Sequence, residues 1–114
     1  MGEQIEIPRW RAEQKRGIYI DFEPLSFPEQ RFSVRMEWNS QREGWNIRIR
    51  HETRDKLVTK GMANPYRVYS YDPWMYFYFA DPSAEATEVT PQNLGDEMRL
   101  YAVPGPEGRP TTEW

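Results

Sequence analysis

Two stretches of the chain alternate strictly between apolar and polar side chains. They are residues 31–38 and 45–50, and the loop that joins them, residues 39–44, is polar. Because successive side chains of a strand point to opposite faces, a period of two places the large apolar residues of both stretches on one face. These residues are Phe32, Val34, Met36, Trp38, Trp45, Ile47 and Ile49. A helix would scatter them around its circumference, so the pattern predicts an antiparallel hairpin and an all-β fold.

Four further segments have the composition of strands and are separated by Gly and Pro signals. They are residues 56–59, 66–71, 74–79 and 97–103, while the alternation of residues 18–22 within the N-terminal part indicates a short strand or an extended peptide. The third sends Met75, Phe77 and Phe79 to one face, which we expect to be core, and Trp74, Tyr76 and Tyr78 to the other. The last three carry an indole N–H and two phenol hydroxyls, which suit a half-wet contact surface. The predicted architecture is a small antiparallel barrel or sandwich.

The chain divides into three parts by composition. Residues 1–26 are predicted to form an N-terminal arm, which is either an ordinary edge strand with its loop or an extended segment that crosses to a neighbouring subunit. Residues 27–103 are the antiparallel β domain. Within it, residues 90–95 are expected to make one helical turn, with Thr90 as N-cap and a Gly at the exit. Residues 104–114 are rich in Pro and Gly, so a flexible tail is expected there.

Composition limits the class of protein. The chain has 114 residues, which is the size of one domain, and 38% of them are apolar while 15% are aromatic. It has no Cys, so a disulfide framework is excluded and a reducing cytoplasm is the expected site of folding. The longest apolar run, residues 74–80, is far too short to span a bilayer. We therefore expect a soluble, unprocessed chain without a membrane segment.

The net charge of −3 hides an uneven distribution. Residues 1–71 carry 13 basic and 10 acidic side chains, a formal charge of +3, whereas residues 72–114 carry 2 basic and 8 acidic ones, a charge of −6. Such a molecule could dock head to tail with copies of itself or meet two partners of opposite sign, although an unevenly charged solvated surface explains the counts equally well. The sequence pI of about 5.2 disfavours nucleic-acid specificity.

The residues available for catalysis are few. His51 is the only histidine, and we expect it at the surface, beside Glu52 at the end of the second hairpin strand. A His beside a carboxylate could serve as a general base, but no nucleophile in a strand-to-helix turn accompanies it. Neither zinc-ligand spacing, nor a calcium loop, nor a glycine-rich phosphate cradle is present. The sequence therefore predicts no cofactor, no metal site and no enzyme activity.

Contact chemistry is better represented. The chain has five Trp, seven Tyr and five Phe, and Trp, Tyr and Arg are the residues that dominate binding energy at protein interfaces. On the outer face of the hairpin, three arginines are expected around the single carboxylate of Glu37, which leaves that face with a positive surplus. An acidic surface, such as the acidic part of another copy, could use it. The predicted interface residues are Trp10, Arg35, Arg48, Arg50, Trp74, Tyr76, Tyr78 and Trp114.

Three segments then follow one another in a recognisable order. Residues 28–34, P-E-Q-R-F-S-V, resemble a "P-N-Q-x-F-x-V" opening, and residues 45–61 are similar to "W-x-L-x-I … D-G-x-x-L-V-x-G". Residues 90–101 resemble a closing "P-T-x-x-D-L-G … R-L-x-Y" block. These motifs, in this order, are those of the small baseplate plug proteins of contractile-tailed bacteriophages. The resemblance covers about residues 28–103.

The resemblance implies a structural protein of the virion. A plug of this kind lies on the tail axis at the baseplate, where the tail tube meets the hub and spike. It helps to close the channel until ejection, and it acts by packing against its neighbours. The implied partners are hub, spike and tail tube subunits, the tape measure protein, and further copies of the chain in a three-fold or six-fold ring. Synthesis and assembly in the host cytoplasm, followed by residence in the tail baseplate, are expected.

Two other function classes remain open. A β-sandwich carbohydrate-binding module would use exposed Trp and Tyr rings to stack on sugars. A small tail-associated hydrolase would need His51 as its base, and the sequence favours it least.

Overall fold

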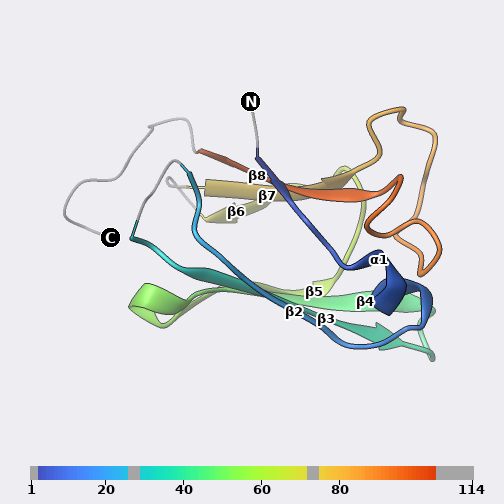
Figure 1. Cartoon of the computed structure of the whole chain (residues 1–114), viewed down its shortest axis with the longest axis horizontal. Coiled ribbons are helices and arrows are strands. Elements are labelled where there is room, and N and C mark those ends of the chain that lie inside the picture. Colours follow the sequence, from blue (N-terminus) through green and yellow to red (C-terminus); the bar gives the residue numbers. More distant parts are fainter. Residues whose placement is uncertain (1–2, 26–28, 72–74, 105–114) are drawn as a thin grey trace.

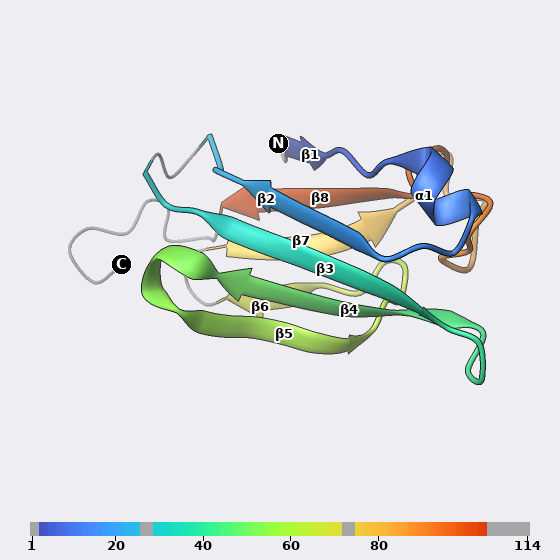
Figure 2. The same ribbon diagram turned by 60° about the horizontal axis from the view of Figure 1, so that its bottom comes forward.

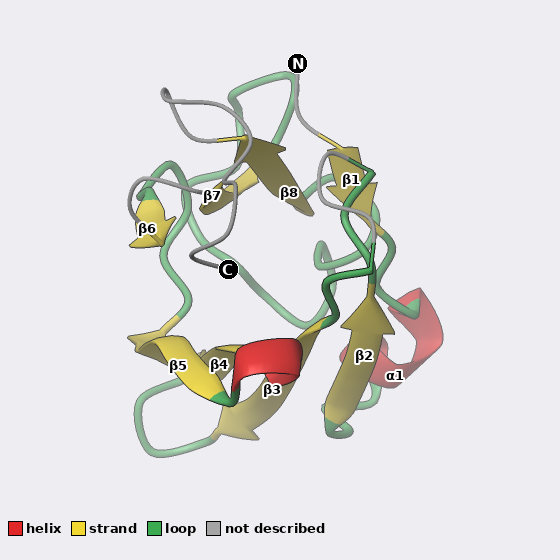
Figure 3. Cartoon of the chain, turned by 90° about the vertical axis from the view of Figure 1, so that its left-hand side faces the viewer, coloured by secondary structure: helices red, strands yellow, loops and turns green. Residues whose placement is uncertain are grey.

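A computed structural model describes residues 3–25, 29–71 and 75–104, which form two four-stranded antiparallel sheets packed face to face (Figures 1 and 3). Sheet A has the order β1 (Glu3–Ile5), β8 (Arg99–Pro104), β7 (Met75–Ala80), β6 (Tyr69–Tyr71). Sheet B has the order β2 (Ile18–Phe22), β3 (Phe32–Asn39), β4 (Gly44–His51), β5 (Lys56–Met62). The all-β antiparallel prediction is confirmed, and the sandwich, not the barrel, is the architecture.

The predicted hairpin is formed by β3 and β4. Its register pairs Trp38 with Trp45 at the loop end and Phe32 with His51 at the other end. The alternating apolar side chains are buried between the sheets, except that Trp38 is only partly buried. Aromatic rings connect the two layers, because Phe77 of sheet A contacts Phe22 and Phe32 of sheet B at ring-centroid distances of 6.2 and 5.9 Å.

The other predicted strands exist with shifted bounds. Strand β5 continues to Met62 beyond the predicted end, because Gly61 adopts φ +147°, a conformation that only glycine tolerates easily, and the pairing with β4 carries on through it. Strand β6 begins at Tyr69, later than predicted, since the preceding chain turns at Tyr66, whose φ is +62°. The apolar face of β7, formed by Met75, Phe77 and Phe79, is core as expected.

The N-terminal segment belongs to both sheets. Strand β1 pairs with β8 at one edge of sheet A, and β2 pairs with β3 at one edge of sheet B. Between them lies the helix α1 (Arg9–Glu13), which the sequence analysis did not predict. It is only five residues long, and its N-cap residue, Pro8, makes no side-chain capping bond. Such a helix leaves too little periodic signal to detect.

The turn predicted at residues 90–95 is present as one helical hydrogen bond, from Leu94 N to Thr90 O at 3.0 Å. Thr90 and Asn93 cap it reciprocally: Asn93 N donates to Thr90 Oγ1, and Thr90 N donates to Asn93 Oδ1. Gly95 leaves the turn with φ +86°. A Cβ at Gly95 would lie 2.7 Å from the carbonyl oxygen of Ile7, so the turn packs directly on the backbone of the N-terminal segment.

The surface position expected for His51 is wrong. Its side chain is fully buried, because the β3–β4 register places it opposite Phe32 on the inner face of sheet B. The two rings stack with centroids 4.5 Å apart and an angle of 7° between their planes, and Nε2 lies 2.8 Å from Gln30 Oε1. Burial is the main cause that lowers the pKa of His51 from 6.5 to about 4, and the nearby cations Arg54 and Lys56 lower it further.

The Gly95→Ala substitution is expected to lower the free energy of unfolding by about 1–3 kcal/mol, since it adds left-handed strain and a contact that the backbone must relieve. Gly17→Ala is the matched control, because no atom lies within 4 Å of a Cβ built there. Urea unfolding of both variants checks this. Equal stabilities would show that the turn does not lie tightly against residues 7–9.

The burial of His51 also predicts acid sensitivity. The unfolded chain takes up a proton near pH 6.5, whereas the folded chain resists it until about pH 4, so stability is fully present above pH 6.5. On lowering the pH through this window, the free energy of unfolding should fall by up to about 3 kcal/mol from this group. Denaturant unfolding between these pH values measures the slope. His51→Phe, which keeps the stacked ring, should flatten it; an unchanged slope would contradict the assignment.

Candidate functional site

The outer face of sheet B carries one continuous row of side chains across all four strands. Tyr19 of β2 lies opposite Arg35 of β3, Arg35 lies opposite Arg48 of β4, and Arg48 lies opposite Lys60 of β5. All four side chains are exposed. We call these four residues the basic row. Figure 2 shows this sheet from its outer side.

Like charges directly opposite one another on neighbouring strands are unfavourable, so the basic row has an electrostatic cost. Arg35 is partly compensated by Glu37, whose Oε1 lies 3.3 Å from its Nε, with both side chains more than half exposed. No ion pair joins Arg48 or Lys60 to any carboxylate within the described residues. The fold therefore places two uncompensated cations side by side in the middle and at the edge of the sheet.

Arg50 differs from the other two arginines of the hairpin. We expected all three around Glu37, but Arg50 pairs instead with Glu52, at 3.6 Å, and with Asp55. Glu52 also accepts a hydrogen bond from the buried hydroxyl of Ser33, which is the main cause that lowers the pKa of the Glu52 carboxyl. Arg50 is therefore neutralised within the sheet, whereas Arg48 and Lys60 have no such carboxylate partner in the described part of the chain.

Three shallow hollows in the described part of the chain adjoin the basic row, and the smallest, of about 120 Å³, lies between Tyr19 and Arg50. The first, of about 440 Å³, is lined by Arg35, Arg48, Lys60 and Glu37, among others. The second, of about 490 Å³, shares Arg35 and Glu37 with the first and extends along β2 past Tyr19. The side of this second hollow includes Lys15, whose Nζ lies 5.3 Å from the centre of the Trp38 ring. The surface is therefore hollowed and open to solvent along the basic row.

The sequence analysis missed three residues of this surface, namely Lys15, Tyr19 and Lys60. Their membership depends on β2 and β5 pairing with the two sides of the hairpin, and no local pattern states that pairing. The alternation of residues 18–22 was a usable signal for Tyr19, since Ile18 is buried and Tyr19 is 61% exposed.

The remaining predicted interface residues lie elsewhere. Trp10, on α1, is 55% exposed, and the guanidinium of Arg11 lies 5.0 Å from the centre of its ring. Tyr76 and Tyr78 are half-buried on the outer face of sheet A, where Tyr78 stacks on Tyr101 with ring centroids 5.3 Å apart. Trp74 and Trp114 lie outside the described residues. The structure thus brings Arg35 and Arg48 together and leaves Trp10 and the tyrosines on other surfaces.

No group of three or more His, Cys, Asp and Glu side chains within the described residues could hold a metal ion. His51 is enclosed in the core and is not directed at a cleft. The described chain also contains no helix with the length and apolar character needed to cross a membrane.

The cost of the basic row can be measured. Arg48→Thr removes the central cation and keeps a side chain that suits a strand, so the free energy of unfolding is expected to rise by about 0.2–1 kcal/mol at low salt. The gain should shrink as salt screens the repulsion. Arg42→Thr, in the exposed hairpin loop, is the control and should change little. If Arg48→Thr destabilised the protein equally at all salt concentrations, the contribution of the Arg48 stem to packing would outweigh the repulsion.

Comparison with known proteins identifies the family to which the chain belongs. Residues 18–105 match the model of the family described as cyanophage baseplate Pam3 plug gp18. No curated protein and no solved structure was found to match the chain. The family match begins at β2 and includes the whole of sheet B, three strands of sheet A and the connection between β7 and β8. Because it spans well over half of the sequence, the resemblance to baseplate plug proteins is confirmed, and the chain belongs to this family of structural proteins of the phage tail baseplate.

Proposed function

We propose that this protein closes the axial channel of a contractile-tail baseplate at the junction of tail tube, hub and spike. The observation that carries the proposal is the family match over residues 18–105. The protein would act by packing against these subunits without turning over a substrate. This agrees with the position of His51, which is fully enclosed in the core.

The two outer faces of the sandwich support a role between several partners. Sheet A presents the half-buried rings of Tyr76, Tyr78 and Tyr101, which combine an apolar body with a hydroxyl that can remain hydrated. Sheet B presents the basic row. A protein that is contacted on opposite sides by different subunits would use two such unlike surfaces, because charge complementarity fixes orientation while aromatic burial supplies affinity.

Incorporation into particles tests the proposal. The double variant Tyr76→Ser/Tyr78→Ser should reduce the amount of this protein in purified tails by at least about tenfold, since it removes two aromatic contacts from the face of sheet A. Leu57→Ser, at an exposed apolar position on β5 of sheet B and so away from that face, is the control. Both variants must first be shown by urea unfolding to be folded under the assembly conditions.

The position of the protein in the particle tests the axial assignment itself. Tails that carry a labelled copy should show the label on the tail axis where tube, hub and spike meet, by electron microscopy. A label at the baseplate periphery would overturn the channel-closing role. If the tyrosine variant were incorporated normally but lost binding to a glycan array that the wild-type protein shows, the carbohydrate-binding alternative would replace the proposal.

A further inference from the structure

We propose that the basic row docks the acidic β7–β8 connection of a second copy of this chain, so that copies associate head to tail. This inference deepens the proposed function, because it names one partner of the outer face of sheet B. It depends on two surfaces of opposite charge that the same chain carries at different places.

The basic side of the contact lacks counter-ions. Arg48 and Lys60 have no ion-pair partner within the described residues, and Arg35 shares only the exposed carboxylate of Glu37. Binding an anionic surface here would relieve the repulsion between facing cations as well as add attraction. This is why an acidic partner is favoured over an apolar one.

The acidic side is the connection between β7 and β8, residues 81–98. It contains five carboxylates and no Lys or Arg. Two of the five are already used within the chain. Asp81 is buried and accepts hydrogen bonds from Ser83 and Ala86, and these bonds, that from Ser83 N first, lower the pKa of its carboxyl. Asp96 forms an ion pair with Arg9, with 3.4 Å between its Oδ2 and the Arg9 Nη2.

The three remaining carboxylates, those of Glu85, Glu88 and Glu97, are exposed and make no ion pair within the described part of the chain. They equal in number the three cations of the basic row. The same chain therefore carries three carboxylates that could neutralise the three cations of the row, and these carboxylates form no ion pair within the described residues.

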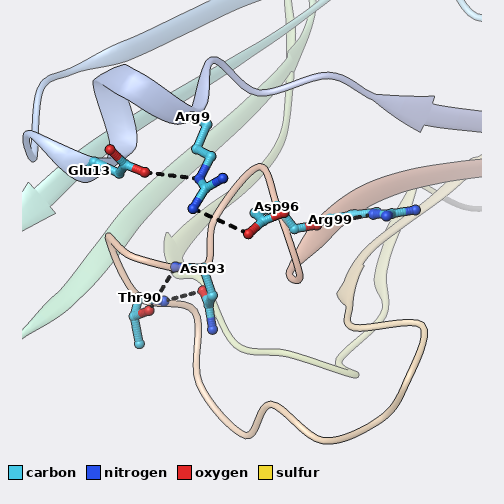
Figure 4. A network of polar contacts seen from close by, with 6 residues as sticks. All are labelled: Arg9, Glu13, Thr90, Asn93, Asp96 and Arg99. Carbon is cyan, nitrogen blue, oxygen red and sulfur yellow. Dashed lines mark hydrogen bonds and ion pairs between the residues drawn. The ribbon is translucent and has the colours of Figure 1, made fainter.

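The acidic connection is also held in shape, although it contains no helix or strand. Asp81 anchors its beginning, and the hydroxyl of Tyr66 donates to the carbonyl oxygen of Ala86 at 2.8 Å. The reciprocal bonds of Thr90 and Asn93 and the ion pairs of Arg9 with Glu13 and Asp96 hold its second half (Figure 4). A connection that is ordered before binding loses little conformational entropy on docking.

The relative position of the two surfaces decides the kind of assembly. The β7–β8 connection lies at one end of the sandwich beside α1, whereas the basic row lies on the outer face of sheet B (Figures 1 and 2). The contact therefore joins different patches of two copies and is heterologous. When the two patches of one copy meet two different neighbours, each added copy leaves one patch of each kind open, and such an assembly closes only as a ring.

Nucleic acid is a weaker candidate for the same row. A phosphate backbone would meet three cations close to Glu37, on a molecule whose net charge is −3. A second copy instead presents its carboxylates on a compact connection, which matches a basic surface of limited extent. The test below includes nucleic acid as one of its outcomes.

Reciprocal charge reversal tests the contact. Sedimentation of the full chain should show self-association that weakens as salt rises from about 0.05 M to about 0.5 M. Arg48→Glu/Lys60→Glu and Glu85→Lys/Glu88→Lys should each weaken self-association by about tenfold or more. An equimolar mixture of the two variants should restore it, because the reversed, acidic row of one variant then meets the reversed, basic connection of the other, and the two unreversed patches also remain complementary.

Controls separate this contact from general charge effects. Arg42→Glu and Glu6→Lys each reverse one exposed charge outside both surfaces, and they should leave self-association unchanged. A wild-type chain that stays monomeric, or a mixture that fails to restore association, would overturn the proposal. So would salt-dependent binding of a DNA oligonucleotide that Arg48→Glu/Lys60→Glu abolishes without any effect on self-association.

Particle incorporation keeps this inference distinct from the proposed function. If Arg48→Glu/Lys60→Glu blocked incorporation while self-association remained normal, the basic row would bind another baseplate subunit. The head-to-tail contact would then be wrong and the plug function would stand. If self-association behaved as expected while the labelled protein lay off the tail axis, the reverse would hold.

Discussion

The register between β3 and β4 is the constraint on which the rest of the molecule depends. It pairs Met36 with Ile47 on the inner face, and by the same alternation it places Arg35 against Arg48 on the outer face. A slip by one residue would exchange the two faces and expose the apolar side chains to water. The repulsion between the arginines is therefore tolerated because the core permits no other alignment, and hydrophobic burial exceeds it several times over.

The same register explains how the sequence predicts some features and misses others. The hairpin and the core face of β7 could be derived because their alternation is local and uninterrupted. His51 was misplaced although the alternation of Trp45, Ile47 and Ile49 continues to it on the inner face, because a titratable side chain at a strand end was expected in solvent. Lys60 and Tyr19 belong to the basic row only through the pairing of β5 and β2 with the hairpin. For Lys60 and Tyr19 the missing information was which strands are neighbours, and periodicity does not carry it.

The sandwich separates its two kinds of contact chemistry by layer. Aromatic side chains fill the interior and continue to the outer face of sheet A, whereas guanidinium and ammonium groups gather on the outer face of sheet B. The β7–β8 connection adds an acidic surface at one end. A small protein thus offers three chemically distinct surfaces. This arrangement suits a component that is surrounded by other polypeptides, as expected of a baseplate protein.

The edge strand β1 has a consequence for how the molecule reaches its native state. Its partner is β8, and the pair joins Glu3 to Ala102, so this contact spans nearly the whole described chain. During synthesis β1 must wait until β8 has left the ribosome, while β2 to β5 can already pair. Sheet B is therefore free to form co-translationally, and sheet A closes last through a contact of long sequence separation, which slows folding. Until β1 pairs with β8, the edge of β8 has unpaired backbone N–H and C=O groups, and it is the edge that a chaperone or rapid incorporation into the growing tail would protect from aggregation.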